Sequence, residues 1–141
     1  MENSNTMIPD LQSSLICDDV RQERNGKFML IGIFDAIGVP QYPAVFQRIC
    51  MVNRWCCGLG EFAQQTRLLK PDGVTVVVEG KPVPVKLPNE HANATCIEVF
   101  MNVELKEPGI YWIEILLDER LILRYPLNAA KINRPPQQPP A

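Results

Sequence analysis

The most constraining stretch of this sequence is residues 110–117, IYWIEILL, which are apolar except for Glu114 and rich in β-branched and aromatic side chains. A run this short is typical of a strand covered on both faces rather than of a buried helix. Pro108-Gly109 interrupts the chain before it, and Asp118-Glu119-Arg120 is a turn that lets residues 121–125 pair back antiparallel. The stretch therefore predicts a buried hairpin that needs a second sheet packed above it.

A second hairpin is predicted at Asn25-Gly26, which lies between two apolar stretches. This dipeptide is a strong hairpin signal because both central residues of a type I′ turn need positive φ. With these two residues in the turn, Val20 lies opposite Ile31. Both faces of the hairpin are then largely apolar, so we expect it to lie inside the protein or at a contact between subunits.

Residues 94–105 show the most regular alternation in the chain. The side chains expected to face the core are Thr95, Ile97, Val99, Met101, Val103 and Leu105. Those expected to face solvent are Cys96, Glu98, Asn102 and Glu104, with Phe100 as an apolar exception on the solvated face. Residues 61–69 are more polar and predict a strand near the edge of a sheet.

Together these runs predict an all-β protein with about eight strands, folded as an antiparallel two-layer β-sandwich of immunoglobulin-like type. Tyr111, just after Pro108-Gly109, stands where a tyrosine closes a corner in such folds. We expect residues 1–12 to be a flexible arm, 13–130 a single domain and 131–141 a disordered tail rich in proline and glutamine. No helix of normal length is expected.

Composition restricts the classes of function. The net charge of -2 gives no electrostatic basis for binding nucleic acid or an anionic membrane. No apolar run is long enough to cross a membrane, and residues 1–10 lack the features of a secretory signal. The odd number of cysteines, five, favours reduced thiols and a cytoplasmic location over a disulfide framework.

One candidate for chemistry is the acidic group formed by Asp18, Asp19 and Asp35. Carboxylate oxygens suit magnesium or calcium, so these residues could form a cation site. Neighbours in a strand face opposite ways, however, so Asp18 and Asp19 do not easily share one ion. The alternative is structural, with one aspartate exposed and the other bonded to backbone, Arg21 or Arg54.

Cysteine and histidine are a second candidate. Cys56-Cys57 with His91 and Cys96 could form a zinc site, or a cysteine could act as a nucleophile with His91 as its base. Adjacent cysteines in a strand point to opposite faces, and no C-x-x-C spacing occurs. We therefore expect no metal, no cofactor and five ordinary thiols, Cys17 and Cys50 being the other two.

A third candidate is a binding face. Arg54, Trp55 and Phe62, with Arg48 and Arg67, could form a mixed basic and aromatic patch on one sheet. The alternative is that Trp55 belongs to the core and the arginines lie along a solvated surface. Phe100 would add an exposed apolar side chain to such a face.

Three segments resemble a family of small stand-alone bacterial proteins catalogued only as a domain of unknown function. They are SLICDDVRQERNGKFMLIGIFDAI, RWCCGLGEFAQQTRLLKPDG and PGIYWIEILLDERLILRYPL, and the likeness covers most of residues 13–128. The resemblance implies a cytosolic bacterial β-sandwich with no assigned activity and no catalytic residues. The chain departs from the family pattern at Cys56-Cys57 and at Glu119-Arg120, where glycine is the usual hairpin residue.

Two functions follow from these observations. The first is a non-catalytic binding or assembly module that presents a sheet face or strand edge to a protein partner or to a second copy of itself. The second is a small enzyme, either metal-dependent through Asp18, Asp19 and Asp35 or built on His91 with a cysteine. They differ in whether such groups converge in a concave pocket.

Overall fold

A computed structural model of the chain describes residues 6–133, which form ten strands and no helix. The strands are β1 (Asp10–Gln22), β2 (Phe28–Ile33), β3 (Ala36–Val39), β4 (Ala44–Cys56), β5 (Gly60–Leu69), β6 (Val76–Glu79), β7 (Val83–Leu87), β8 (Asn93–Leu105), β9 (Gly109–Leu117) and β10 (Arg120–Lys131). The prediction of an all-β protein is confirmed, with more strands than expected.

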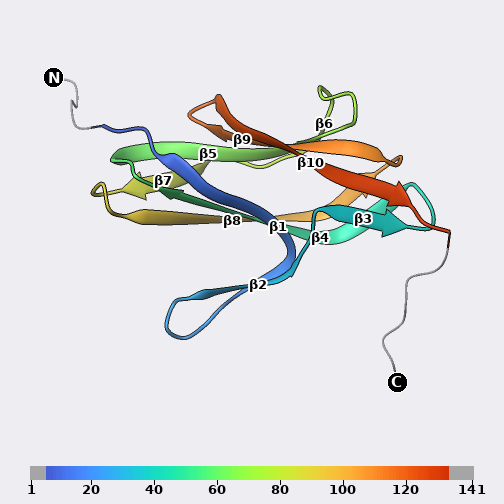
Figure 1. Cartoon of the computed structure of the whole chain (residues 1–141), viewed down its shortest axis with the longest axis horizontal. Helices are drawn as coiled ribbons and strands as arrows, with labels where there is room; N and C mark the ends of the chain where they lie inside the picture. Colours follow the sequence, from blue (N-terminus) through green and yellow to red (C-terminus); the bar gives the residue numbers. More distant parts are fainter. Residues whose placement is uncertain (1–5, 134–141) are drawn as a thin grey trace.

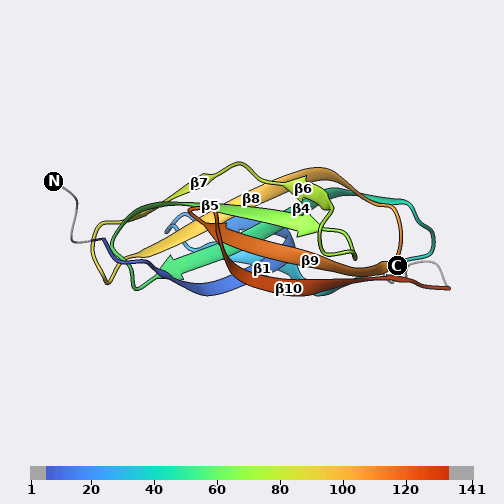
Figure 2. The ribbon, with the colours of Figure 1, turned by 90° about the horizontal axis from the view of Figure 1, so that it is seen from above.

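The strands form two sheets that pack face to face (Figures 1 and 2). One sheet has four strands in the order β2-β1-β4-β8, and the other has six, β3-β10-β9-β5-β6 with β7 also paired to β5. The short β3 runs parallel to β10, so the six-stranded sheet is mixed rather than antiparallel throughout. The main core lies between the sheets and includes Trp55 from β4, Leu105 from β8 and Ile115 from β9.

The predicted central hairpin is confirmed. β9 lies between β10 and β5, and the two residues between β9 and β10, Asp118 and Glu119, have φ values of 47° and 68°. Both central residues are therefore left-handed, as a type I′ turn requires. Asp118 also joins the hairpin to β5, because its backbone N–H donates to Ala63 O at 2.8 Å and its Oδ1 accepts from Ala63 N at 2.9 Å.

The outer face of β9 is covered by side chains rather than by a further layer. Glu114 is buried there beneath Arg67, whose Nε lies 2.7 Å from Glu114 Oε1, and Arg124, whose Nη1 lies 3.5 Å from Oε2. The Arg124 guanidinium also lies over the ring of Trp112, 4.9 Å from its centroid. Two cations thus compensate the buried carboxylate on the face that looks apolar in sequence.

The corner tyrosine is observed. Tyr111 is buried at the start of β9, and its hydroxyl donates to Glu107 O at 2.6 Å, four residues upstream. Burial is the largest cause of the raised pKa of Tyr111. The bond ties the β8–β9 connection to the core.

The register predicted for the first hairpin is wrong by one residue. Val20 pairs with Leu30, not with Ile31. Only Gly26 in the turn has a positive φ, 92°, and its N–H donates to Glu23 O, which is the pattern of a type I turn followed by a left-handed glycine. The longer loop shifts the pairing, and a shift of one residue exchanges the faces of β2.

The faces predicted for β8 are also wrong over most of its length. Ile97 and Val99 stand opposite Val52 and Cys50 on the outer face, whereas Cys96, Glu98 and Phe100 point inward. Asn102 has a φ of 54° and faces solvent, and beyond it Val103 and Leu105 return to the core. One irregular residue therefore divides an apparently continuous alternation into two halves of opposite orientation.

β5 is a central strand rather than an edge strand, since it pairs with β9 on one side and with β6 and β7 on the other. Its polar residues Gln64 and Thr66 lie in the core, not in solvent. β1 begins at Asp10 and Met7 pairs with Leu59, so part of the segment predicted as a flexible arm takes part in β pairing. At the other end Ile132 N donates to Val39 O, and the tail from residue 134 lies outside the described residues.

Within residues 6–133 no helix has the length and apolar character needed to span a membrane.

Candidate interaction surface

β2 is an edge strand that extends away from the body of the molecule, at the bottom of Figure 1. Its six residues, FMLIGI, carry no charge. Phe28 is 40 % exposed, Ile31 42 % and Ile33 56 %, and Met29 is exposed as well. The hairpin is therefore not interior to the protein, and its apolar side chains reach solvent on both faces of the strand.

The outer face of the four-stranded sheet continues this apolar surface. Cys17, Cys50 and Val52 form a small buried cluster there, with Val20, Leu30 and Ile97 packed against it. The β2 hairpin covers part of this cluster. Between that hairpin and β4 lies an open groove of about 660 Å³ whose apolar lining is Leu15, Phe28, Leu30 and Val52.

Charged side chains that form no ion pair among residues 6–133 border this surface. Lys27 and Arg54 line the groove, and no carboxylate among residues 6–133 lies within ion-pair distance of either. Lys27 precedes β2 and Asp35 follows it, and both are exposed. Asp35 likewise has no ion-pair partner among those residues. An apolar strand is thus flanked by a cation and an anion that have no ion-pair partner among residues 6–133.

The predicted basic and aromatic patch is not assembled. Trp55 is fully buried, Phe62 is buried, and Phe100 packs against the core between the sheets. Arg54 remains exposed on the outer face of the four-stranded sheet, where its Nε donates to Thr95 Oγ1 at 3.3 Å. Arg67 lies on the opposite side of the molecule, bound to Glu114.

The three aspartates do not form a cation site either. Asp19 binds Arg48 at 2.8 Å and Arg21 at 3.2 Å, and the hydrogen bond from Arg21 is the largest cause of the lowered pKa of Asp19. Asp18 and Asp35 are exposed. Among residues 6–133 no three His, Cys, Asp or Glu side chains are grouped closely enough to hold a metal ion. The structural alternative for these aspartates describes what is observed.

No hydrogen bond joins His91 to a cysteine among residues 6–133, and its side chain lies near Glu90 instead. His91 lies exposed in the turn before β8, whereas Cys96 is buried, and burial raises the pKa of the Cys96 thiol to about 11. Cys56 and Cys57 differ from the expectation in another way. Cys57 has a φ of 59° and lies just beyond the end of β4, so the alternation of a continuing strand does not apply to the pair.

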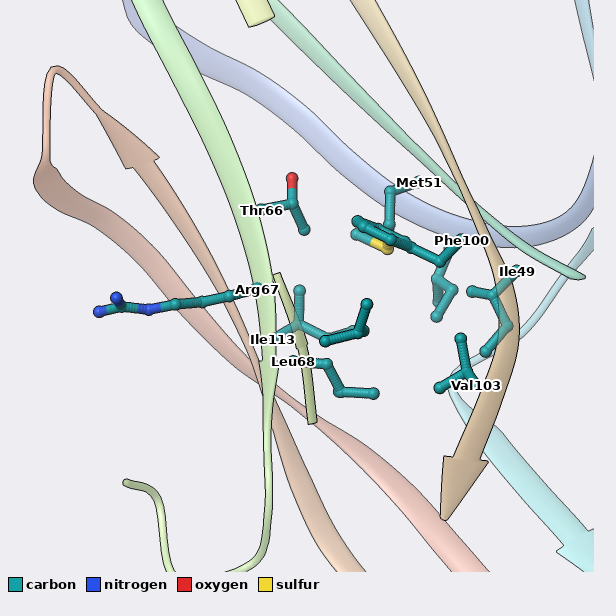
Figure 3. Close-up of a pocket in the computed structure, with 10 residues that line it drawn as sticks. Ile49, Met51, Thr66, Arg67, Leu68, Phe100, Val103 and Ile113 are labelled. Carbon is teal, nitrogen blue, oxygen red and sulfur yellow. The ribbon is translucent and has the colours of Figure 1, made fainter. Parts of the chain in front are cut away.

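The cavity inside the main core is too small for an organic ligand. A cavity of about 20 Å³ lies among Ile49, Met51, Phe100 and Val103 on one side and Leu68 and Ile113 on the other, with Arg67 pointing away from it (Figure 3). A volume of that size matches about one water molecule, and its lining is apolar. The cavity is a packing defect rather than a binding pocket.

A buried polar network is the feature that sequence reasoning missed. Gln64 Nε2 and Thr66 Oγ1 donate to Glu98 Oε1 at 2.6 and 2.7 Å. Asn53 Nδ2 donates in turn to Gln64 Oε1 and to Thr66 Oγ1, at 2.9 and 3.0 Å. Asn53 Oδ1 is buried and accepts no hydrogen bond from any of residues 6–133. The polar residues of β5 are the part of the sequence that indicates this network, but their polarity predicts a strand at the edge of a sheet instead.

The network contains no cation to balance Glu98, which is only 7 % exposed. Burial is the largest cause of the raised pKa of Glu98, opposed by the hydrogen bonds from Thr66 and Gln64. The other carboxylate oxygen, Oε2, lies against Gly80, where a Cβ would clash with it. The glycine between β6 and β7 therefore makes room for the carboxylate.

Comparison with known protein families gives a match over most of the chain. Residues 12–130 are similar to a family model described as "Family of unknown function (DUF6941)". No curated protein matches the chain.

Proposed function

The chain belongs to this family of unknown function, and we propose from its own surface that it is a non-catalytic assembly module that binds a second copy of itself through β2. The observation that supports the proposal is an uncharged, exposed strand at an open sheet edge. An apolar edge strand with free backbone groups is a template for pairing with another chain. β2 lacks the charged residues and prolines that usually prevent such pairing.

Symmetry restricts how two copies of β2 pair. The usual homodimer has a two-fold axis, here perpendicular to the sheet between two antiparallel β2 strands. Rotation about such an axis keeps each side chain on the same face of the sheet. Residues that stand directly opposite each other share a face, so they lie an even number of positions apart in the sequence. The pairing is therefore centred on a residue of β2.

Charge selects Ile31 as that residue. Lys27 lies four positions before Ile31 and Asp35 four positions after it, so a pairing centred on Ile31 brings the beginning of each β2 strand, preceded by Lys27, beside the end of the other, followed by Asp35. Exposed ion pairs contribute only about 0.2–1 kcal/mol each, so they determine the register rather than the affinity. The affinity comes from burying Phe28, Met29 and Ile31 and from the backbone hydrogen bonds of the new strand pair.

The proposal extends to fold type and location. We assign the two sheets to an immunoglobulin-like sandwich, a choice supported by the corner formed by Tyr111. The parallel pair of β3 and β10 is a departure from that type. A bacterial cytoplasm is implied by the sequence resemblance, and five free thiols support it.

Sedimentation velocity over a range of concentrations tests the proposal. We expect the full chain to associate and Ile31→Lys to sediment as a monomer, because each new lysine would face its symmetry mate at the dimer axis. Val74→Lys is the matched control, since Val74 is 77 % exposed in the loop before β6 and far from β2 in the sheet order. A native chain that stays monomeric at the highest attainable concentration overturns the proposal, as does a dimer that Ile31→Lys leaves intact.

A further inference from the structure

The groove between the β2 hairpin and β4 has a floor made by three strands of the four-stranded sheet. Leu15 of β1 stands opposite Val52 of β4. Arg54, two positions further along β4, stands between Ser13 of β1 and Thr95 of β8. Residues directly opposite each other share a face of the sheet, as do residues two positions apart in one strand. The floor therefore consists of an apolar row and a polar, cationic row, which lie side by side and roughly 7 Å apart.

The β2 hairpin forms the wall of this groove. Phe28 and Leu30 are two positions apart and therefore lie on one face of β2. Leu30 is half-buried against the small cysteine and valine cluster of the outer face, whereas Phe28 is 40 % exposed. Leu15, on the floor, is 37 % exposed. An aromatic and an aliphatic side chain are thus left open to a ligand at the apolar end of the groove.

The charge of the groove is positive. No Asp or Glu of residues 6–133 lines it, and none of them forms an ion pair with Arg54. Arg54 Nε donates to Thr95 Oγ1 at 3.3 Å, and within that part of the chain its two terminal nitrogens donate to no other group. Arg48 and Arg67, in contrast, each bind a carboxylate. Because a guanidinium binds a carboxylate through two parallel hydrogen bonds, Arg54 has the donors that a carboxylate ligand needs.

We propose that this groove binds an amphipathic organic carboxylate, such as a medium-chain fatty acid. The carboxylate lies at Arg54, and the apolar chain lies along Leu15, Val52 and Phe28. The groove volume of about 660 Å³ is in the range of small-molecule sites. Its floor is a sheet face, which presents side chains rather than backbone groups and so offers no strand-type hydrogen bonds to an extended peptide. The site is distinct from the proposed pairing of two copies, which uses the free edge of β2.

Isothermal titration calorimetry with decanoate, below its micelle concentration, tests the proposal. We expect one molecule to bind per chain, and decanol and acetate to bind more weakly because each lacks one half of the amphipathic ligand. Arg54→Gln should weaken decanoate binding by roughly 10–100-fold, the usual contribution of hydrogen bonds to a charged group, and should leave decanol binding unchanged. Leu15→Thr should weaken binding of both by roughly tenfold, because it removes apolar contact.

Two controls separate this site from the rest of the surface. Arg120→Gln removes an exposed arginine at the beginning of β10, in the other sheet, and should leave decanoate binding unchanged. Ile31 is three positions from Phe28 and so lies on the opposite face of β2. Ile31→Lys should therefore bind decanoate like the native chain even where it no longer pairs with a second copy.

Four results overturn the proposal. They are no binding of decanoate, equal binding of decanol and decanoate, native affinity in Arg54→Gln, and loss of binding in either control. A peptide of alternating glutamate and leucine that binds at Arg54 where decanoate does not would assign the groove to a protein partner and overturn the proposal as well.

Discussion

At the residue scale, the most unusual feature of the core is the buried carboxylate of Glu98. Its carboxylate is buried with hydrogen-bond donors but with no cation, whereas the other buried carboxylate, Glu114, has two arginines. Burying a charge without an opposite charge destabilises the folded state unless the group is neutralised. The two glutamates therefore differ in what compensates their burial, which is two arginines for Glu114 and hydrogen-bond donors alone for Glu98.

We predict that Glu98→Gln raises the melting temperature near pH 8 and has a smaller effect near pH 4. The pKa of Glu98 is raised in the folded state, so its contribution to stability is fully present below the unfolded pKa and is lost as the pH rises through the folded pKa. An amide keeps the acceptor for Gln64 and Thr66 without the charge. Thermal denaturation across this pH range, with the exposed Glu104→Gln as control, checks the prediction. Equal destabilisation by Glu98→Gln at both pH values would refute it.

The location of Glu98 could not be predicted from alternation alone. The pattern of β8 is regular in sequence, and Asn102 gives no signal of its left-handed conformation beyond its residue type. In a regular strand, the burial of Val103 and Leu105 would place Glu98 on the opposite face, in solvent. The same limit explains Phe100, which we placed in solvent and which lies against the core.

At the element scale, the two hairpin turns show what turn chemistry can and cannot determine. The turn at Asp118-Glu119 lies where the apolar runs on both sides predict it, although neither residue is glycine. Arg120, which the sequence places in the turn, already pairs with Leu117, and the register shifts between Leu121 and Leu123. The turn at Asn25-Gly26 was identified correctly but given the wrong type, and one added loop residue shifted the whole of β2. Turn position is thus easier to predict than turn type.

Glu119→Gly should stabilise the protein by about 1 kcal/mol, since a left-handed conformation costs an L-residue about that much and glycine very little. Glu119 has a φ of 68° and is exposed, so the substitution removes no buried contact. Chemical denaturation measures the change. The control is Glu61→Gly, an exposed residue inside β5, which should instead lower stability. A loss of stability in Glu119→Gly equal to that of the control would contradict the strain argument.

β9 itself is the element whose loss should cost most. Ile113 and Ile115 are almost completely buried in the main core, so truncating either to alanine should destabilise the protein by about 2–5 kcal/mol. Ile110→Ala, at the exposed beginning of the same strand, is the control and should have a small effect. Similar losses at Ile110 and Ile115 would show that β9 is not the centre of the core.

At the scale of the whole molecule, the sequence predicted the fold class and the surplus of apolar surface, but not where that surplus lies. Both faces of the β2 hairpin are apolar in sequence, which predicts either an interior position or a contact between subunits. The structure excludes an interior position for β2, because it extends beyond the facing sheet (Figure 1). The predicted aromatic binding face does not exist, because Trp55 and Phe62 belong to the core and Phe100 packs against it.

The central claim is that two copies pair through β2 in the register centred on Ile31. Sedimentation equilibrium of a charge-reversal series tests it most directly, because Lys27 and Asp35 are exposed and have no ion-pair partner within residues 6–133. Lys27→Glu and Asp35→Lys should each weaken the dimer by placing like charges across the axis, and the double variant should restore it. If the double variant is as weak as either single one while the native dimer persists, the register is wrong. A native chain that is a monomer throughout would contradict the claim altogether.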